Sequence, residues 1–143
     1  MPHTHERLIA IVGPTASGKS DLAIALARKY DGEIISADSR QVYRGMDIGT
    51  GKVPRDPLPA NFFYSEGIRH HLIDIADPDK EYNISHFLRD ARASIDDIRS
   101  RGKLPIICGG THFWIQALLE DTDLPAVPPD ATLRQQLAAR TPE

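Results

Sequence analysis

The stretch GPTASGKS, residues 13–20, decides the fold of this chain. A glycine, four further residues and then Gly-Lys-Ser form the spacing of a loop that wraps a phosphate group. The apolar run LIAIV at 8–12 precedes the loop, and apolar residues at helical spacing follow it over 19–29, before an Asp-Gly stop. A strand, a glycine turn and a helix in this order are the context that confirms the motif. The stretch therefore predicts a phosphate site at the amino end of a helix, where backbone N–H groups and the helix dipole favour an anion.

The remaining apolar segments predict an α/β fold of the phosphate-loop nucleoside-triphosphate-hydrolase type, with a parallel sheet flanked by helices. Further strands are expected at 33–37, 70–75 and 104–108, and an amphipathic helix over 84–102 with its cap at Ser85. Another helix is expected after the glycines at 109 and 110. The segment 45–69 holds four glycines and three prolines, so we expect a long functional loop outside the core.

Two regions are expected along the chain: a catalytic core at 1–121 and the start of a helical region at 122–143. The second region opens with the proline-rich DTDLPAVPPD at 121–130, and Asp130 can cap a short helix that runs to Arg140. Because Thr-Pro-Glu at 141–143 itself has the pattern of a helix start, we expect the chain to be a truncated piece of a longer protein.

Composition excludes several classes of protein. With 143 residues, 26% of them charged, the sequence contains no apolar run near the roughly 20 residues of a membrane helix. It has no secretory signal pattern, so we expect a cytoplasmic protein that does not contact a membrane. A single cysteine, Cys108, excludes an internal disulfide and is expected to be a packed thiol. His70 and His71 are adjacent in a strand, so they point to opposite faces, and no zinc site is expected.

The net charge of −3 argues against a surface coated with basic residues for nucleic acid. A local site is not excluded, because basic residues gather between positions 38 and 71: Arg40, Arg44, Lys52, Arg55 and Arg69. Taken singly, each of these is also explained as a solvated loop charge.

Asp38 is the first candidate for chemistry beyond the phosphate loop. It follows a buried strand whose end faces the ligand crevice in an open parallel sheet, so its carboxylate could take a proton from a nucleophile. An alternative is that Asp38 only caps the turn at Ser39. A second glycine turn, GGT at 109–111, places Thr111 at a helix start and could offer N–H groups and a hydroxyl to the same anion. Glycines used only for close packing are the alternative there.

Hydrolysis-driven switching is disfavoured. A nucleoside-triphosphate motor should carry an acid at the end of an apolar strand to hold Mg²⁺. The strand LPIICGG ends on glycines, Asp74 is a weak substitute, and no Asn-Lys-x-Asp guanine signature is present.

Four segments, in this order and at these intervals, resemble the tRNA dimethylallyltransferases, the isopentenyl transferases that modify an adenosine next to certain anticodons. They are GPTASGKS, ISADSRQVYRGMDIGTGK, HHLIDI and IICGGTHFWIQALL, and the resemblance runs from about residue 7 to 134. One departure is Gly51, where the family usually has alanine, which bears on the stiffness of the loop.

The resemblance implies a prenyltransferase that moves a dimethylallyl group from dimethylallyl diphosphate to N6 of an adenosine adjacent to the anticodon in tRNA. It implies Asp38 as general base. The chemistry of the residues adds Lys19 and Thr111 as catalytic groups that stabilise the leaving diphosphate, and the Ser20 hydroxyl as a ligand for Mg²⁺. The implied tRNA contacts are Asp38, Ser39, Arg40, Gln41 and Thr111, with the flipped-out adenine among them. The diphosphate is expected on Gly13, Pro14, Thr15, Ala16, Ser17, Gly18, Lys19 and Ser20. The partners are therefore dimethylallyl diphosphate and a tRNA anticodon stem-loop, and a monomer is expected.

Three rival functions stay open. A small-molecule kinase shares the ATP-binding form of the phosphate loop, but it would need a lid with arginines, and residues 111–143 offer no clear one. An adenylate-type isopentenyl transferase would use free AMP or ATP as acceptor. A noncatalytic nucleotide-binding module is the third.

Overall fold

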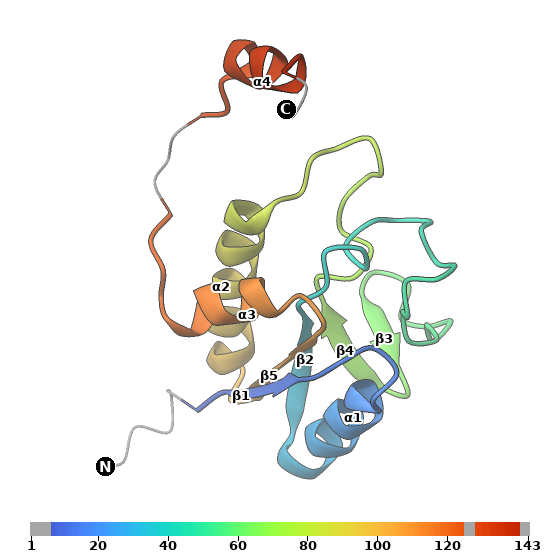
Figure 1. The fold of residues 1–143 in the computed structure, drawn as a ribbon. Coiled ribbons are helices and arrows are strands. Elements are labelled where there is room, and N and C mark those ends of the chain that lie inside the picture. The colour runs from blue at the N-terminus through green and yellow to red at the C-terminus, as the bar shows by residue number, and fades with distance from the viewer. Residues whose placement is uncertain (1–6, 125–127, 141–143) are drawn as a thin grey trace.

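The computed structural model describes residues 7–124 and 128–140, and its elements form a sheet with helices on both faces (Figure 1). In chain order they are β1 (Ile9–Val12), α1 (Lys19–Tyr30), β2 (Gly32–Ser36), β3 (Phe63–Ser65), β4 (Ile68–His71), α2 (Ile84–Ser100), β5 (Leu104–Gly109), α3 (His112–Leu119) and α4 (Ala131–Ala138). The five strands lie in the order β1-β5-β2-β4-β3. The predicted α/β architecture, with a phosphate loop between the first strand and the first helix, is confirmed.

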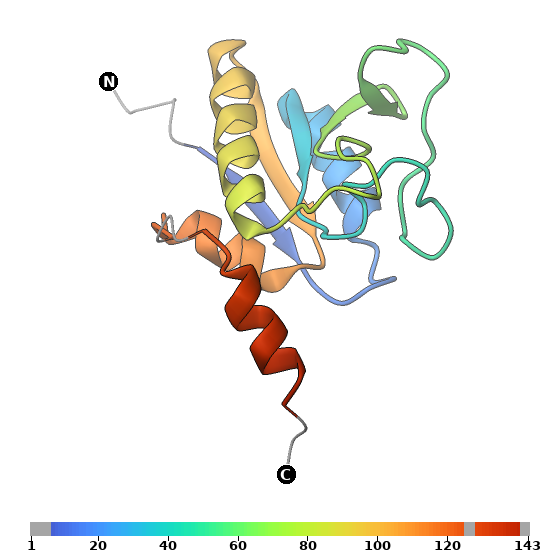
Figure 2. The ribbon, with the colours of Figure 1, turned by 90° about the horizontal axis from the view of Figure 1, so that it is seen from above.

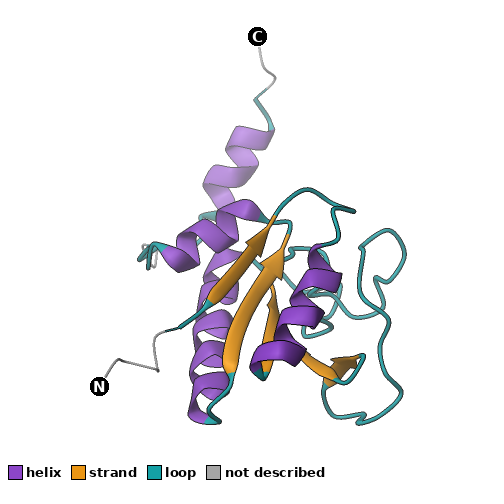
Figure 3. Cartoon of the chain, turned by 90° about the horizontal axis from the view of Figure 1, so that it is seen from below, coloured by secondary structure: helices purple, strands orange, loops and turns teal. Residues whose placement is uncertain are grey.

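The two central strands divide the apolar core between the two faces of the sheet. Ile34 and Ile106 pack against α1, whereas their chain neighbours Ile35 and Ile107 pack against α2 and α3. Side chains alternate along a strand, so a central strand that is covered on both faces is apolar throughout. Figures 2 and 3 show α1 on one side of the sheet and α2 with α3 on the other. Because β1, β5 and β2 are parallel to one another, their carboxyl ends lie at the same edge of the sheet, and the loops that follow them meet there.

The sheet is mostly parallel, as expected, with one antiparallel strand at its edge. The pairs β1–β5, β5–β2 and β2–β4 are parallel, whereas β3 pairs antiparallel with β4. This edge hairpin lies partly inside 45–69, where only loop was expected. β3 is only three residues long, and a strand this short, among glycines and prolines, shows no alternation of apolar and polar residues by which it could be predicted.

The strand expected at 70–75 lies instead at β4, residues 68–71. Leu72 and Asp74 have φ values of 65° and 56°, in the left-handed region that ends an extended strand. The apolar run in the sequence carries no sign of this turn. Residues 74–76 still pair, but with the loop 41–44 rather than with a strand of the sheet.

Helix ends follow side-chain chemistry, with one correction. α1 ends at Tyr30, and the following Asp31, with a φ of 50° and an N–H bond to the Ala27 carbonyl, forms a left-handed cap, as the Asp-Gly stop predicted. α2 begins at Ile84, and its cap is Asn83, not Ser85. The Asn83 side chain accepts from the N–H groups of Ser85 and His86, because it precedes the first turn while Ser85 lies within it.

α4 is a short helix on which no residue is buried, and Figure 1 shows it apart from the sheet. Asp130 caps it as predicted, since Oδ1 accepts from the N–H of Leu133 at 2.9 Å. The helix ends at Ala138, and the helix start expected at 141–143 lies outside the described residues. Among the helices at 7–124 and 128–140, none combines the length and the apolar character that crossing a membrane requires.

Candidate active site

The phosphate loop connects the end of β1 to the first turn of α1. Ala16 and Gly18 have φ values of 60° and 83°, and alternation into the left-handed region turns successive N–H groups toward one concave side. Gly18 is the cap residue of α1, and within the described residues no side chain caps this helix. The amide donors of the first turn are therefore available to an anion, as the motif predicts.

A cavity of about 320 Å³ opens beside this loop. Of the predicted diphosphate residues, Thr15, Ala16, Ser17, Gly18, Lys19 and Ser20 line it. Its other walls come from the first turn of α1, the end of β2, the following loop and the end of β5, and are formed by Asp21, Asp38, Arg40, Gln41, Thr50, Gly51, Cys108, Gly109 and Gly110. The structure thus brings the phosphate loop and the Asp38 carboxylate to one cavity.

Gly13 and Pro14 are not among the lining residues, and they shape the loop instead. The Pro14 carbonyl accepts from the Ser17 hydroxyl at 2.7 Å and from the Lys19 ammonium at 2.5 Å. A Cβ on Gly13 would meet the Ser17 oxygen at 3.3 Å, which is tighter than ordinary contact. These bonds hold the Lys19 charge at the loop.

Asp38 follows the end of β2, and its side chain is only 13% exposed. Its Oδ1 accepts from the backbone N–H of Arg40 at 2.9 Å and of Gln41 at 3.4 Å. A Cβ on Gly110 would lie 3.9 Å from Oδ2, so the second oxygen faces the glycine turn after β5. The turn-capping role is therefore present, but it uses one oxygen and leaves the other toward the cavity.

Thr111 lies behind the cavity wall rather than in it. Its hydroxyl accepts from the N–H of Ser39 at 3.0 Å, and its own N–H donates to the Ala37 carbonyl at 3.1 Å. The backbone at Gly109 lies so close to the backbone at Ala37 that only glycine fits, because an added Cβ would lie 2.1 Å from the Ala37 oxygen. Thr111 and Ser39 tie the ends of β2 and β5 together, and close packing accounts for Gly109.

Gln41 presents a fixed amide to the cavity. Ser36 Oγ donates to Gln41 Oε1 at 2.9 Å, and Gln41 Nε2 donates to the Thr50 carbonyl at 3.0 Å. Thr50 was not predicted as a site residue, nor were Asp21 and Cys108. A usable signal existed only for Thr50, which lies in the IGTGK part of the segment that carries the family resemblance.

The basic residues between positions 38 and 71 do not gather at one entrance. Arg40 alone of the five lines the cavity. Arg44, Arg55 and Arg69 line a second groove of about 350 Å³, and the Lys52 side chain is 5% exposed. The single thiol, Cys108, is buried as expected, and burial raises its pKa.

Oxygen atoms in the cavity suit Mg²⁺, which prefers hard ligands. The Ser20 hydroxyl and the Asp38 and Asp21 carboxylates share the cavity with the phosphate loop. Asp74 is absent from that lining; its carboxylate accepts from Lys52 at 2.6 Å. The oxygen-bearing residues of this lining therefore fit a magnesium ion.

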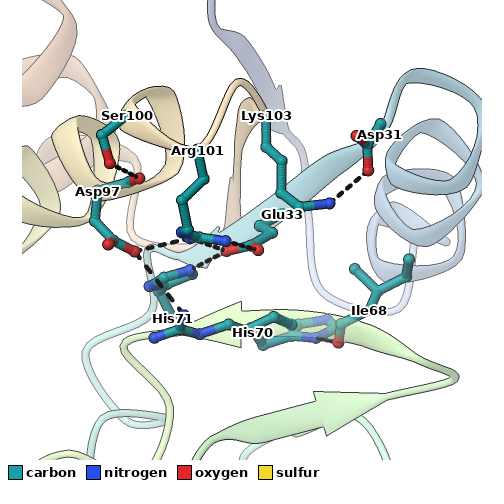
Figure 4. Close-up of polar contacts among 10 residues, drawn as sticks. Asp31, Glu33, Ile68, His70, His71, Asp97, Ser100, Arg101 and Lys103 are labelled. Atoms are coloured by element: carbon teal, nitrogen blue, oxygen red, sulfur yellow. Dashed lines mark hydrogen bonds and ion pairs between the residues drawn. The ribbon is translucent and has the colours of Figure 1, made fainter.

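A second polar cluster lies around Glu33, at the start of β2, and Figure 4 shows its side chains converging. Glu33 accepts from Arg101 at 2.5 and 2.7 Å and contacts His71 Nε2 at 2.7 Å. Asp97 joins through Arg101 at 2.7 Å. Although Glu33, His71 and Asp97 could together ligate a metal, the Arg101 guanidinium binds both carboxylates, so the cluster is a salt-bridge network. His70 points away and contacts the Ile68 carbonyl.

Comparison with known proteins gives one consistent result. Residues 41–143 match the family model described as IPP transferase, and residues 6–63 match the one described as isopentenyl transferase. A tRNA dimethylallyltransferase of Exiguobacterium is 52% identical over 91% of this chain and 40% of its own length.

Solved structures agree in fold. The tRNA isopentenylpyrophosphate transferase of Bacillus halodurans matches with a TM-score of 0.76 at 42% identity, over 94% of this chain and 42% of that protein. A eukaryotic dimethylallyltransferase acting on tRNA matches with a TM-score of 0.68 at 33% identity, over 93% and 35%. The chain thus spans between 35% and 42% of the length of these relatives. By its sequence and its fold, the chain belongs to the IPP transferase family.

Proposed function

We propose that this chain carries the prenyl-transfer chemistry of a tRNA dimethylallyltransferase: transfer of the dimethylallyl group from dimethylallyl diphosphate to N6 of an adenosine next to the anticodon. The observation that carries the proposal is the cavity in which the phosphate loop and the Asp38 carboxylate lie together. The loop offers a site for a diphosphate, and the carboxylate offers a base at the same place.

The phosphate loop serves the leaving group. As the bond between C1 of the prenyl group and the diphosphate oxygen breaks, negative charge gathers on the diphosphate. Open amides at the start of α1 and the Lys19 ammonium are placed to stabilise that charge. A magnesium ion would be held at the Ser20 hydroxyl, and when bound it would neutralise part of the diphosphate charge.

Asp38 serves the nucleophile. The exocyclic amine of adenine is a weak nucleophile because its lone pair is delocalised into the ring, so removing its proton as N6 attacks C1 is useful. Asp38 Oδ1 is held by two backbone N–H groups, which leaves Oδ2 to take the proton. The N6–C1 bond forms, the C1–O bond breaks, and the proton goes to Asp38.

The neighbouring residues fit the acceptor base. Gln41 presents an amide that is fixed by Ser36 and Thr50, and Arg40 lies exposed at the same cavity. Ser39 and Thr111 act by holding the turn on which Asp38 lies. A base in an RNA loop must be extruded to reach this cavity, as is general for enzymes that modify bases.

A small-molecule kinase remains the main alternative, because it would use the same loop for ATP. Equilibrium titration separates the two: dimethylallyl diphosphate should bind in the presence of Mg²⁺ at least about tenfold more tightly than ATP. The matched control is Lys19→Ala, which removes the loop charge and should weaken binding of the diphosphate. Tighter binding of ATP would favour the kinase, and equal binding of the variant would remove the loop from the site.

A further inference from the structure

Two residues in the segments that carry the family resemblance have no role in the proposed prenyl transfer, although the fold brings them together. Lys52 ends the IGTGK stretch, and Asp74 belongs to HHLIDI. The Lys52 ammonium donates to Asp74 Oδ1 at 2.6 Å, to the Tyr43 carbonyl at 2.6 Å and to Asp47 Oδ1 at 2.9 Å. All three donors of the ammonium are used, and its side chain is 5% exposed.

The acceptors of Lys52 lie on two segments of the chain that contact each other. Tyr43 and Asp47 lie in the loop that follows Asp38, whereas Asp74 lies after β4, on the other side. The backbone joins the same two segments: the N–H of Asp74 donates to the Gln41 carbonyl at 3.1 Å, and the N–H of Arg44 donates to the Ala76 carbonyl at 2.9 Å. Lys52 thus closes a loop that begins at the cavity wall and returns to it at Thr50 and Gly51.

The contact between the loop after Asp38 and the segment after β4 needs the positive charge of Lys52, because it brings the Asp74 carboxylate out of full contact with solvent. Asp74 adopts a left-handed φ of 56°, and its carboxylate is 21% exposed. Burial alone would lower the pKa of Lys52, but the hydrogen bonds and charges of Asp74 and Asp47 outweigh it and raise the pKa. The lysine therefore stays charged, and removing it would leave Asp74 with only the more distant Arg55 guanidinium, 4.0 Å from Oδ2, to balance its charge.

From this geometry we propose that Lys52 is a positioning residue: it locks the segment 41–50 onto Asp74 and thereby fixes Asp38 and Gln41 at the mouth of the cavity. The chain of contacts is short. Thr50, two residues before Lys52, orients the Gln41 amide, and the N–H of Gln41 bonds to Asp38. The consequence for prenyl transfer rests on the proposed function, but the locking itself does not.

Hydrogen exchange followed by NMR tests the locking in the unliganded chain. Lys52→Met keeps the length of the side chain and removes its charge, and Asp74→Asn keeps the shape of its partner. In both variants the backbone N–H of Arg44 and the side-chain amide of Gln41 should exchange roughly tenfold faster or more, as expected for loss of a charged hydrogen bond. Backbone N–H groups of β5, such as Ile107, should stay within about twofold, because they belong to the core.

Asp47→Asn is the matched control. Asp47 binds the same ammonium, but its side chain is 69% exposed and lies in the same loop as Lys52, so its loss should change exchange by less than about threefold. Unchanged exchange in Lys52→Met would overturn the inference. So would an equal acceleration in β5, because Lys52 would then support the fold as a whole.

Titration with dimethylallyl diphosphate distinguishes a failure of the Lys52 proposal from a failure of the proposed function. Affinity should be nearly the same in the wild type and in Lys52→Met, because the phosphate loop lies on other elements. A tenfold loss in the variant alone would show that Lys52 also supports the diphosphate site, and it would overturn a positioning role directed at Asp38 and Gln41. Failure of both proteins to bind would refute the proposed function, while the exchange rates would still decide the role of Lys52.

Discussion

Glu33→Gln should destabilise the chain in a pH-dependent way, because the buried network in Figure 4 depends on the Glu33 charge. Glu33 is 7% exposed and binds Arg101 through both oxygens while contacting His71. Burial alone would raise its pKa, but the hydrogen bonds and charges of Arg101 and His71 outweigh that and lower the pKa from 4.5 to about 2. The network ties the start of β2 to α2 and β4, and β2 leads to Asp38.

The magnitude follows from linkage between ionisation and folding. The interval between 4.5 and about 2, at about 1.36 kcal/mol per pH unit, corresponds to roughly 3 kcal/mol of unfolding free energy at pH 7. Because the folded-state pKa is the lower one, this stabilisation is fully present above pH 4.5. It is lost as the pH falls through that interval toward 2.

Urea unfolding at several pH values measures the effect. At pH 7 the variant should lose about 2–3 kcal/mol of unfolding free energy, and the difference from the wild type should narrow steadily below pH 4.5. Asp31→Asn is the control: its partner Lys103 lies near the network, but Asp31 is 77% exposed, so less than about 1 kcal/mol is expected. A Glu33→Gln difference that is constant from pH 7 to 3 would refute the reasoning, because the charge would then not be its source.

Three further changes probe separate parts of the account. Lys19→Ala should weaken dimethylallyl diphosphate binding about 10- to 100-fold in calorimetry, with an unchanged melting temperature, because it removes a charged donor from an exposed loop. Gly109→Ala should lower the unfolding free energy by about 1–3 kcal/mol in urea, since its Cβ would lie 2.1 Å from the Ala37 oxygen; a neutral effect would show that the strand ends can separate. Asn83→Ala should cost about 1 kcal/mol through loss of the α2 cap, whereas Ser85→Ala should be nearly neutral, and the reverse order would restore Ser85 as the cap.

Local patterns predicted the elements that form the phosphate site. The motif at 13–20 is contiguous, so its strand, loop and helix could be placed from spacing alone. The apolar runs that become β2 and β5 are continuous because both faces of each strand are covered. Asp38 could be placed at the correct edge of the sheet for the same reason, since it directly follows such a run.

The remaining features depend on contacts between distant segments. β3 exists only because it pairs with β4, and the turn at Leu72 depends on pairing of the next residues with the loop 41–44. The Lys52–Asp74 ion pair joins residues that are 22 positions apart, and the sequence does not indicate which acid a given lysine will contact. Thr111 was expected in the cavity because of its helix start, but it is not among the residues that line the cavity, and its hydroxyl accepts from the N–H of Ser39. Tertiary pairing of this kind leaves no periodicity for a sequence to display.

The most direct test of the proposed function is single-turnover prenylation of an anticodon stem-loop, with Asp38→Asn against the wild type. Both are best measured as a chimera in which this chain replaces the matching part of the Exiguobacterium enzyme, since the chain covers 40% of that relative. Asparagine keeps the turn cap but does not accept the proton, so the rate should fall by about 10² to 10⁴ while dimethylallyl diphosphate still binds normally. A rate within a few-fold of the wild type would contradict the account and remove Asp38 from the chemistry.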